Sequence, residues 1–282
     1  MRRCTFRLAP TAAWQPGEIR GDQVVGTTGE QAAHPLGEVT LGPPVWPIRS
    51  FRDFYAFEQH VRSARQRRGL AMIPEWYDAP AFYFSNPATI IGHETPLPAP
   101  PYGRWLDFEL EVGCIIGEGG RDISAEHADR HIAGYTVLND WSLRDVQRQE
   151  MKVGLGPAKG KDFATSLGPA LVTPDELEDR RIAKGFDLAM VARINGREVS
   201  RGNWRDIHFS FGEMIARASQ GVELQAGDLL GSGTVGTGCI LELSPEATGG
   251  WLRPGDVVEL EIERLGVLRT PIVPYAARQE HG

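Results

Sequence analysis

Glu109 and Glu111 are the first residues in this 282-residue sequence whose types and spacing suggest chemistry. Residues i and i+2 of a strand point to the same side, so an extended chain would place the two carboxylates next to each other. Such a pair is unfavourable unless one group is protonated or a cation lies between them, and Mg²⁺ prefers carboxylate oxygens. The alternative is a solvent-facing edge strand, because Asp107 has the same parity and charged edge strands are common. The pattern alone favours that alternative.

Asp140 is a third carboxylate in a position that suits a binding site. It follows the apolar run 135–138 and precedes a predicted helix that begins at Ser142. The end of a strand beside a helix N-terminus is a common place for functional residues, although Asp also caps helices and begins turns. Together with the two glutamates, Asp140 would give a divalent cation three carboxylate ligands and leave positions for water and a bidentate substrate.

Three further patterns indicate chemistry less directly. Lys161 lies in a loop that resembles a phosphate-binding loop, but the glycine spacing differs and Asp162 stands where Ser or Thr is needed. His127 and His131 have the i, i+4 spacing of a helical metal pair, yet they lack a third ligand and have charged neighbours, which favours a solvated helix face. The glycine-rich segment 231–234 allows close approach of a ligand or connects a hairpin.

The elements that must position these residues mix strands with helices. Residues 106–116 alternate and then become continuously apolar, as in a strand that enters a core. The segment 50–53 resembles a capping box, and apolar residues at helical spacing follow it as far as Gly69, which predicts a helix. Further predicted elements are helices over 124–133, 142–152 and 210–219, and strands over 82–84, 188–194 and 257–262. The sequence therefore predicts an α+β fold with a dominant β-rich unit.

Composition excludes several classes of protein. With 41% hydrophobic residues the chain is not disordered, and a net charge of −7 disfavours nucleic acid as a partner. No apolar run reaches the ~18 residues of a membrane span, and no apolar segment follows the basic N-terminus as in a secretory signal. The three cysteines are far apart, which favours a reducing cytoplasm. The 33 glycines and 20 prolines indicate many turns between strands.

Five stretches, taken together, resemble the fumarylacetoacetate hydrolase family over about residues 76–275 and more weakly over 50–70. They are LDFELE (106–111), GYTVLNDWSLRDVQ (134–147), KGKDF (159–163), GSGT (231–234) and GCILEL (238–243). The resemblance implies a mixed β-sandwich roll as the catalytic domain, usually in a homodimer, with Mg²⁺ or Mn²⁺ as cofactor and Ca²⁺ as a substitute in crystals.

The resemblance also implies roles for individual residues. Glu109, Glu111 and Asp140 match the metal ligands of the family, and Lys161 matches an active-site lysine suited to stabilising an oxyanion or an enolate. The positions that match substrate contacts are Arg144, Gln147, Thr234 and Glu242.

Two departures from the family pattern concern the metal and the base. Members that cleave fumarylacetoacetate itself have a further aspartate ligand upstream and a nearby histidine base, and Ala81 and Ala88 align with those positions. The sequence therefore resembles the three-carboxylate branch, in which a mobile N-terminal lid supplies a His and a Glu. His60 becomes the candidate water-activating base with Glu58 as its orienting partner, and the alternative is an exposed helix histidine.

We therefore expect a small N-terminal region with a lid-like helix over 1–70 and a catalytic domain over 71–282. The resulting hypothesis is a cytoplasmic, homodimeric, divalent-metal-dependent hydrolase that cleaves a C–C bond in an acylpyruvate or β-diketo acid, with no nucleic acid or membrane partner. Two alternatives stay open. One is a decarboxylase, enol–keto isomerase or hydratase that uses the same site on a 2-oxo acid, and the other is a non-catalytic binding protein of the same fold.

Overall fold

A mixed twelve-stranded sheet is the main element of the computed structural model, which describes residues 1–29 and 31–276. The order along its path is β4-β3-β2-β1-β14-β12-β11-β19-β6-β7, with β5 paired to β1 and β8 paired to β14. Its strands are β1 (Arg2–Arg7), β2 (Gln15–Arg20), β3 (Gln23–Gly26), β4 (Ala33–Pro35), β5 (Thr40–Leu41), β6 (Phe51–Phe54), β7 (Phe82–Ser85), β8 (Ile90–Ile91), β11 (Leu110–Ile116), β12 (Ile132–Asp140), β14 (Thr165–Val172) and β19 (Leu229–Gly231).

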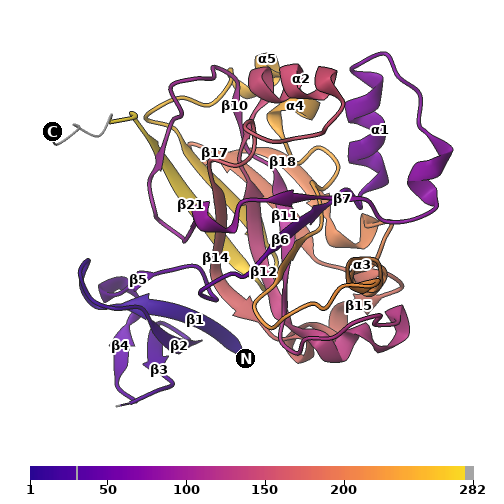
Figure 1. Cartoon of the computed structure of the whole chain (residues 1–282). Helices are drawn as coiled ribbons and strands as arrows, with labels where there is room; N and C mark the ends of the chain where they lie inside the picture. Colours follow the sequence, from indigo (N-terminus) through magenta and orange to yellow (C-terminus); the bar gives the residue numbers. More distant parts are fainter. Residues whose placement is uncertain (30, 277–282) are drawn as a thin grey trace, which may run out of the picture.

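A second, five-stranded sheet runs in the order β18-β17-β20-β21-β9 and lies beside β12 and β14 (Figure 1). Apolar side chains of the two sheets, such as Val112 and Val137 from one and Leu260 and Ile262 from the other, join a single core. The strands of the second sheet are β9 (Leu97–Pro98), β17 (Ala189–Ile194), β18 (Arg197–Asn203), β20 (Val257–Ile262) and β21 (Gly266–Val273). Two short strand pairs lie outside these sheets, namely β10 (Leu106–Asp107) with β13 (Ser142–Leu143) and β15 (Arg181–Ile182) with β16 (Gly185–Phe186).

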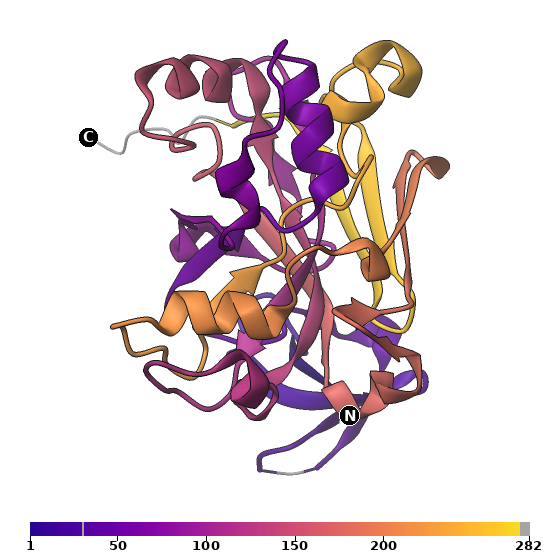
Figure 2. The ribbon, with the colours of Figure 1, turned by 90° about the vertical axis from the view of Figure 1, so that its right-hand side faces the viewer.

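The helices gather mainly at one end of the sheets. Figures 1 and 2 show α1, α2, α4 and α5 there, with the hairpin of β2 and β3 at the opposite end. The α-helices are α1 (Glu58–Gln66), α2 (Arg144–Val153), α3 (Phe211–Ser219), α4 (Ile240–Leu243) and α5 (Pro245–Thr248). The 3₁₀ helices are Leu36–Glu38, Pro74–Tyr77, Pro87–Thr89, Ala125–His131, Pro174–Arg180 and Trp204–Asp206. None of the helices in the described part of the chain has the length and apolarity that a membrane span requires.

The α+β fold with a dominant β-rich unit is confirmed, but one predicted element is wrong. Residues 50–53 do not open a helix: Phe51–Phe54 form β6, and α1 begins only at Glu58. All four residues of β6 are buried: Phe51 and Phe54 pack in the apolar core, and the strand lies between β19 and β7 in the sheet. The predicted helix over 124–133 is the 3₁₀ helix Ala125–His131.

The N-terminal 70 residues contribute strands to the same sheet as the rest of the chain. β1 pairs with β14, and β6 lies between β19 and β7. The backbone of the predicted small region is therefore hydrogen-bonded to the predicted catalytic domain, and a boundary at residue 70 stays a prediction. The consequence for the site is that β6 can present a side chain beside those of β11 and β12.

Candidate functional site

Three buried carboxylates come together from neighbouring strands of the large sheet. Asp53 lies on β6, Glu111 on β11 and Asp140 at the end of β12, and one carboxylate oxygen of each lies within 4.8 Å of the others. Strand register explains the meeting, because β19 bridges the other strands and pairs Gly231 with Asp53 on one side and with Gly113 on the other. The pairing of the strands therefore fixes the backbone positions from which the three carboxylates extend.

This cluster is electrostatically unfavourable without a cation. Burial raises the pKa of Asp53 well above its usual value and the charge of Asp140 raises it further, while burial and the charge of Asp53 do the same for Glu111. Burial also raises the pKa of Asp140, although Lys161 opposes the rise. Within residues 1–29 and 31–276, Asp53 Oδ1 and Asp140 Oδ1 have no hydrogen-bond partner. Oxygen donors that are buried, close together and unpartnered fit a hard divalent cation.

Gly231 provides the room for this cluster. A Cβ at that position would lie 2.3 Å from Asp53 Oδ1 and 3.0 Å from Glu111 Oε2. Any side chain there would therefore displace the Asp53 carboxylate and crowd that of Glu111. The glycine-rich segment 231–234 thus has a steric role in the site in addition to its place after a strand.

Glu109 and Lys161 lie directly beside the cluster. Lys161 Nζ contacts both Glu109 Oε2 and Asp140 Oδ2, and the hydroxyl of Tyr83 donates to Asp140 Oδ2 at 2.6 Å. Burial acts to raise the pKa of Glu109, but the charges of Lys161 and Arg144 outweigh it and lower that pKa. Burial acts to lower the pKa of Lys161, yet the charges of Asp140 and Glu109 raise it. Lys161 is therefore a buried ammonium ion between two carboxylates.

The predicted trio is thus regrouped. Glu111 and Asp140 share the cluster with Asp53, whereas the oxygens of Glu109 contact two cationic side chains next to it. Asp53 is a fourth carboxylate that the three-carboxylate prediction does not contain, since that prediction aligns Ala81 with the further aspartate ligand of the family. Ala81 itself lies on the wall of the cavity described below.

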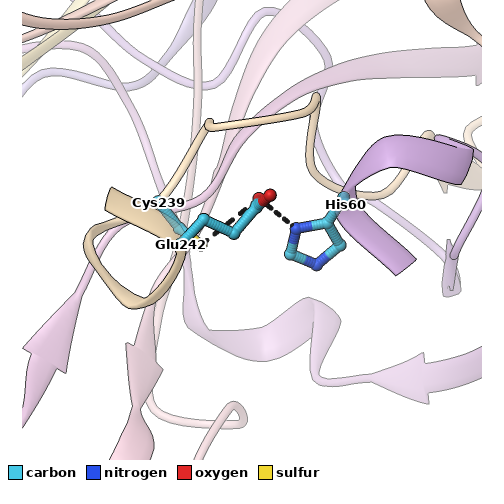
Figure 3. Close-up of side chains that lie close together, drawn as sticks. All are labelled: His60, Cys239 and Glu242. Carbon is cyan, nitrogen blue, oxygen red and sulfur yellow. Dashed lines mark hydrogen bonds and ion pairs between the residues drawn. The ribbon is translucent and has the colours of Figure 1, made fainter. Parts of the chain in front are cut away.

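His60 forms a buried pair with Glu242. The Nδ1 atom of His60, on α1, contacts Glu242 Oε1, on α4, and the second ring nitrogen faces away from this carboxylate (Figure 3). The rings of His60 and Tyr55 form a T-shaped pair with a centroid distance of 5.4 Å. Burial acts to raise the pKa of Glu242, but His60 outweighs it and lowers that pKa. Glu242, placed among the substrate contacts by the resemblance, is thus the carboxylate that orients this histidine.

Glu58 does not orient His60, which corrects the prediction. Its carboxylate contacts Arg62 one helical turn away and accepts a hydrogen bond from Tyr77 at 2.7 Å, and its side chain is 33% exposed. His60 is 5% exposed, so the alternative of an exposed helix histidine is wrong as well. Successive residues of α1 point in different directions, which places these two side chains on different faces of the helix.

Asp107 holds two parts of the site together. It accepts hydrogen bonds from Arg144 Nε at 2.7 Å and from the backbone N–H groups of Ile240 and Leu241 at 2.8 and 3.0 Å. Its residue is fully buried, and Glu109 and Glu111 are buried too, so the exposed edge strand is excluded. Asp107 therefore links the Arg144 side chain to the first turn of α4, the helix that carries Glu242.

The remaining predicted contacts are also at the site. Arg144 donates to Glu109 Oε1 at 2.7 Å and to Gln147 Oε1 at 3.0 Å. Thr234 donates to Glu111 Oε1 at 3.4 Å, and the backbone N–H of Gly233 donates to its Oε2 at 3.1 Å. These bonds orient the carboxylates of Glu109 and Glu111.

One cavity of about 790 Å³ connects these groups. Its walls combine carboxylates, cationic side chains and apolar rings. The polar lining residues are Asp53, His60, Glu109, Glu111, Arg144, Gln147, Lys161 and Thr234, and the additional cationic residues are Arg67, Arg68, Arg148 and Lys152. A volume of this size suits a small-molecule substrate.

Asp53 and Tyr83 are the site residues that the sequence analysis missed. A charged pair, Arg52 and Asp53, interrupts an aromatic stretch, and buried charges between aromatic residues are a signal of function. That signal was hidden by the capping-box interpretation of residues 50–53. Tyr83 lay in a correctly predicted strand, but no pattern distinguished it from Phe82 and Phe84.

Comparisons with other proteins identify the family. A family model described as "Fumarylacetoacetate (FAA) hydrolase C-terminal" matches residues 49–273. A fumarylacetoacetase of Arabidopsis thaliana is 29% identical over 261 residues, which cover 75% of this chain and 62% of that protein, so the chain spans about three fifths of that relative. A mitochondrial oxaloacetate tautomerase of Homo sapiens is 32% identical over 243 residues, covering 85% of this chain and 71% of that protein.

A solved structure shows the same fold. The 5-carboxymethyl-2-hydroxymuconate delta-isomerase from Mycobacterium smegmatis superposes with a TM-score of 0.76 at 24% identity, over 98% of this chain and 100% of that one. The proteins similar to this chain thus include ones named as a fumarylacetoacetase, an oxaloacetate tautomerase and a delta-isomerase. Since the family model covers most of the sequence, the chain belongs to the fumarylacetoacetate hydrolase family.

Proposed function

We propose that the chain is a divalent-metal-dependent hydrolase that cleaves a C–C bond in an acylpyruvate or a related β-diketo acid. The observation that supports it is the presence of a carboxylate cluster and a His60–Glu242 pair at one cavity. Hydrolysis needs a group that stabilises negative charge and a base that activates water. This site has candidates for both groups, whereas isomerisation does not need a base that activates water.

Asp53, Glu111 and Asp140 would hold the divalent cation, with Glu109 next to them. When bound, such an ion acts as a Lewis acid toward keto or enolate oxygens. Mg²⁺ or Mn²⁺ suits this all-oxygen set. The identity of the ion and the assembly of the chain into a homodimer are part of the proposal, and metal analysis with size-exclusion chromatography tests both.

Lys161 would stabilise the negative charge that develops on the leaving enolate. Its ammonium group is buried at the cavity wall, where an electrostatic contribution is larger than in water. Arg144 is held by two carboxylates and would meet the substrate carboxylate with its outer edge. The additional cations around the cavity, Arg67, Arg68, Arg148 and Lys152, favour a substrate whose distal end is also anionic.

His60 would act as the general base. Because Nδ1 donates to Glu242, the lone pair of Nε2 can accept a proton from water, and Glu242 stabilises the imidazolium that forms. The water oxygen bonds to the acyl carbonyl carbon, the C–C bond breaks, and its electron pair moves to the pyruvate enolate. His60 then returns the proton to the enolate carbon, which yields a carboxylic acid and pyruvate.

Keto–enol tautomerisation of oxaloacetate is the second candidate, because a relative of that name is 32% identical over 85% of this chain. In that reaction the same residues would move one proton between carbon and oxygen without an attacking water. The two candidates therefore differ in whether water enters the product.

The deciding experiment supplies acylpyruvates and the enol form of oxaloacetate to the Mg²⁺-loaded protein. We expect pyruvate release from acylpyruvate, with one ¹⁸O atom from labelled water in the acid product, and loss of this activity in His60→Ala but not in the control Glu58→Gln. Tautomerisation without any pyruvate release would reject hydrolysis and favour the second candidate. Full hydrolytic activity after exhaustive chelation would reject the metal.

A further inference from the structure

A buried thiol lies beside the His60–Glu242 pair (Figure 3). The Sγ atom of Cys239 donates to Glu242 Oε1 at 3.7 Å, and the same oxygen contacts His60 Nδ1. One nitrogen, one sulfur and one oxygen atom of these residues therefore lie within 4.8 Å of one another. The proposed hydrolysis uses the histidine and the carboxylate but has no task for the thiol.

The chain holds these three atoms in place from two directions. Cys239 and Glu242 are three residues apart at the first turn of α4, which brings their side chains to one side of the helix. The backbone N–H of Thr237 donates to the other oxygen of Glu242 at 3.2 Å and fixes its carboxylate. His60 approaches from α1, and its ring lies on the cavity wall.

We propose that His60, Cys239 and Glu242 form a second metal site, selective for thiophilic divalent ions such as Zn²⁺ or Cd²⁺, whose occupation inhibits the enzyme. The ligand set is the reason for the selectivity. Zn²⁺ takes tetrahedral combinations of thiolate, imidazole and carboxylate, with water in the remaining position. Mg²⁺ avoids sulfur and prefers the all-oxygen cluster of Asp53, Glu111 and Asp140.

The thiol itself does not serve as a nucleophile. Cys239 is fully buried, and burial together with the charge of Asp107 raises the pKa of its thiol well above the usual value. Since the thiolate is the reactive form, Cys239 is inert toward electrophiles at neutral pH. A divalent ion differs from an electrophile because its charge replaces that of the lost proton.

Ion binding has a defined proton balance. The ion takes the place of the proton between His60 Nδ1 and Glu242. That proton moves to Nε2, so the imidazole stays neutral. Cys239 releases its thiol proton to solvent, which gives one proton released for each ion bound. A protonated Nε2 cannot accept a proton from water, and this is why occupation inhibits. The inhibition rests on the proposed role of His60, whereas the binding does not.

Binding is tested first, on the full chain with the carboxylate cluster saturated with Mg²⁺. Titration calorimetry with Zn²⁺ in buffers of different ionisation enthalpy should show a site that releases one proton. Loss of an outer-shell partner alone costs about 10–100-fold in affinity, so Cys239→Ser should weaken Zn²⁺ by at least about tenfold. Cys114→Ser removes a buried thiol elsewhere and should bind Zn²⁺ as the unmodified chain does. Cd²⁺ should give a thiolate charge-transfer band in the unmodified chain and in Cys114→Ser, but not in Cys239→Ser.

Equal Zn²⁺ affinity in the unmodified chain and in Cys239→Ser, with no Cd²⁺–thiolate band, would overturn the site. Cys239→Ala and the thermal unfolding of each variant separate ligand loss from misfolding. Inhibition of hydrolysis by Zn²⁺ should require at least about tenfold more ion in Cys239→Ser. Unchanged inhibition in that variant would mean that Zn²⁺ acts at the carboxylate cluster and would reject the inhibitory role. If no hydrolysis is found at all, the proposed function fails while calorimetry still decides the site.

Discussion

The carboxylate cluster and the His60–Glu242 pair face one cavity but are built in different ways. The cluster stands on β6, β11 and β12, which have hydrogen-bonded neighbours on both sides in the large sheet. The pair stands on α1 and on the four-residue helix α4 at the helical end of the molecule (Figure 1). The position of a bound cation is therefore fixed by the sheet, whereas the position of the base depends on contacts between two short helices.

The largest effect is expected from Asp53→Asn, which tests the strand side of the comparison. The substitution keeps the shape of the side chain but removes one charge from the cluster. We expect kcat/KM to fall by at least about 100-fold, because even outer-shell losses at metal sites cost about 10–100-fold. Calorimetry with Mg²⁺ should show the matching loss of affinity. Normal Mg²⁺ binding by this variant would remove Asp53 from the ligand set.

Glu242→Gln breaks the helix side alone. The amide holds the ring less strongly and cannot stabilise an imidazolium, so kcat should fall by about 10–100-fold, less than the ~10²–10⁴-fold that a lost general base can cost. Mg²⁺ affinity should not change, since Glu242 lies outside the cluster. A parallel loss of Mg²⁺ binding would show that the two groups are not independent.

Gly231→Ala tests whether the cluster depends on empty space. The added methyl group would lie 2.3 Å from Asp53 Oδ1, and overpacking of this kind costs about 1–3 kcal/mol. We expect Mg²⁺ affinity to fall by about tenfold, which corresponds to about 1.4 kcal/mol. Gly113→Ala is the matched control, because its Cβ would meet side-chain carbons of Thr136 and Leu229 at 3.1 and 3.3 Å and no carboxylate. The control should keep its Mg²⁺ affinity.

The pH dependence of stability should differ with and without metal. Burial raises the pKa of Asp53, Glu111 and Asp140, so the metal-free folded chain keeps protons that the unfolded chain releases. At constant ionic strength, the Tm of the metal-free chain should therefore fall as the pH rises from about 4 toward neutrality. A bound cation compensates the charges, so the rise in Tm caused by Mg²⁺ should be larger at pH 8 than at pH 6. An equal rise at both would contradict the assignment.

The smallest effect is expected from Glu58→Gln. Glu58 lies on the same helix as His60 but contacts Arg62 and Tyr77 at the surface. Exposed ion pairs contribute little, so kcat should change by less than about twofold. A loss comparable to that of Glu242→Gln would mean that α1 rearranges when substrate binds.

The sequence predicted the parts of the site that depend on local pattern. Glu109, Glu111, Asp140 and Lys161 lie in motifs whose order along the chain identifies the family, and the structure brings them together. Asp53 escaped because β6 is four residues long and buried on both faces, so it lacks the alternation that marks a half-exposed strand. A short strand of this kind cannot be distinguished from the start of a helix by periodicity.

The partner of His60 was missed for a different reason. Glu58 is its neighbour in sequence, but Glu242 is its neighbour in space, and the two helices that carry the pair are 182 residues apart at the contact. Nothing in either local sequence specifies that meeting. It follows from the packing of α1 against α4, two helices that only the folded chain brings together.

The parallel pairing of β6 with β19 has a consequence for biosynthesis. During translation, Asp53, Glu111 and Asp140 all leave the ribosome before residues 229–231 are made, yet β19 is the strand that joins β6 to β11 in the sheet. Parallel pairing over such a separation requires closure of a long loop and is slow. A nascent chain that stops short of β19 therefore carries every carboxylate of the cluster without the capacity to hold them together. The cluster should accordingly bind a metal ion only after β19 has been synthesised.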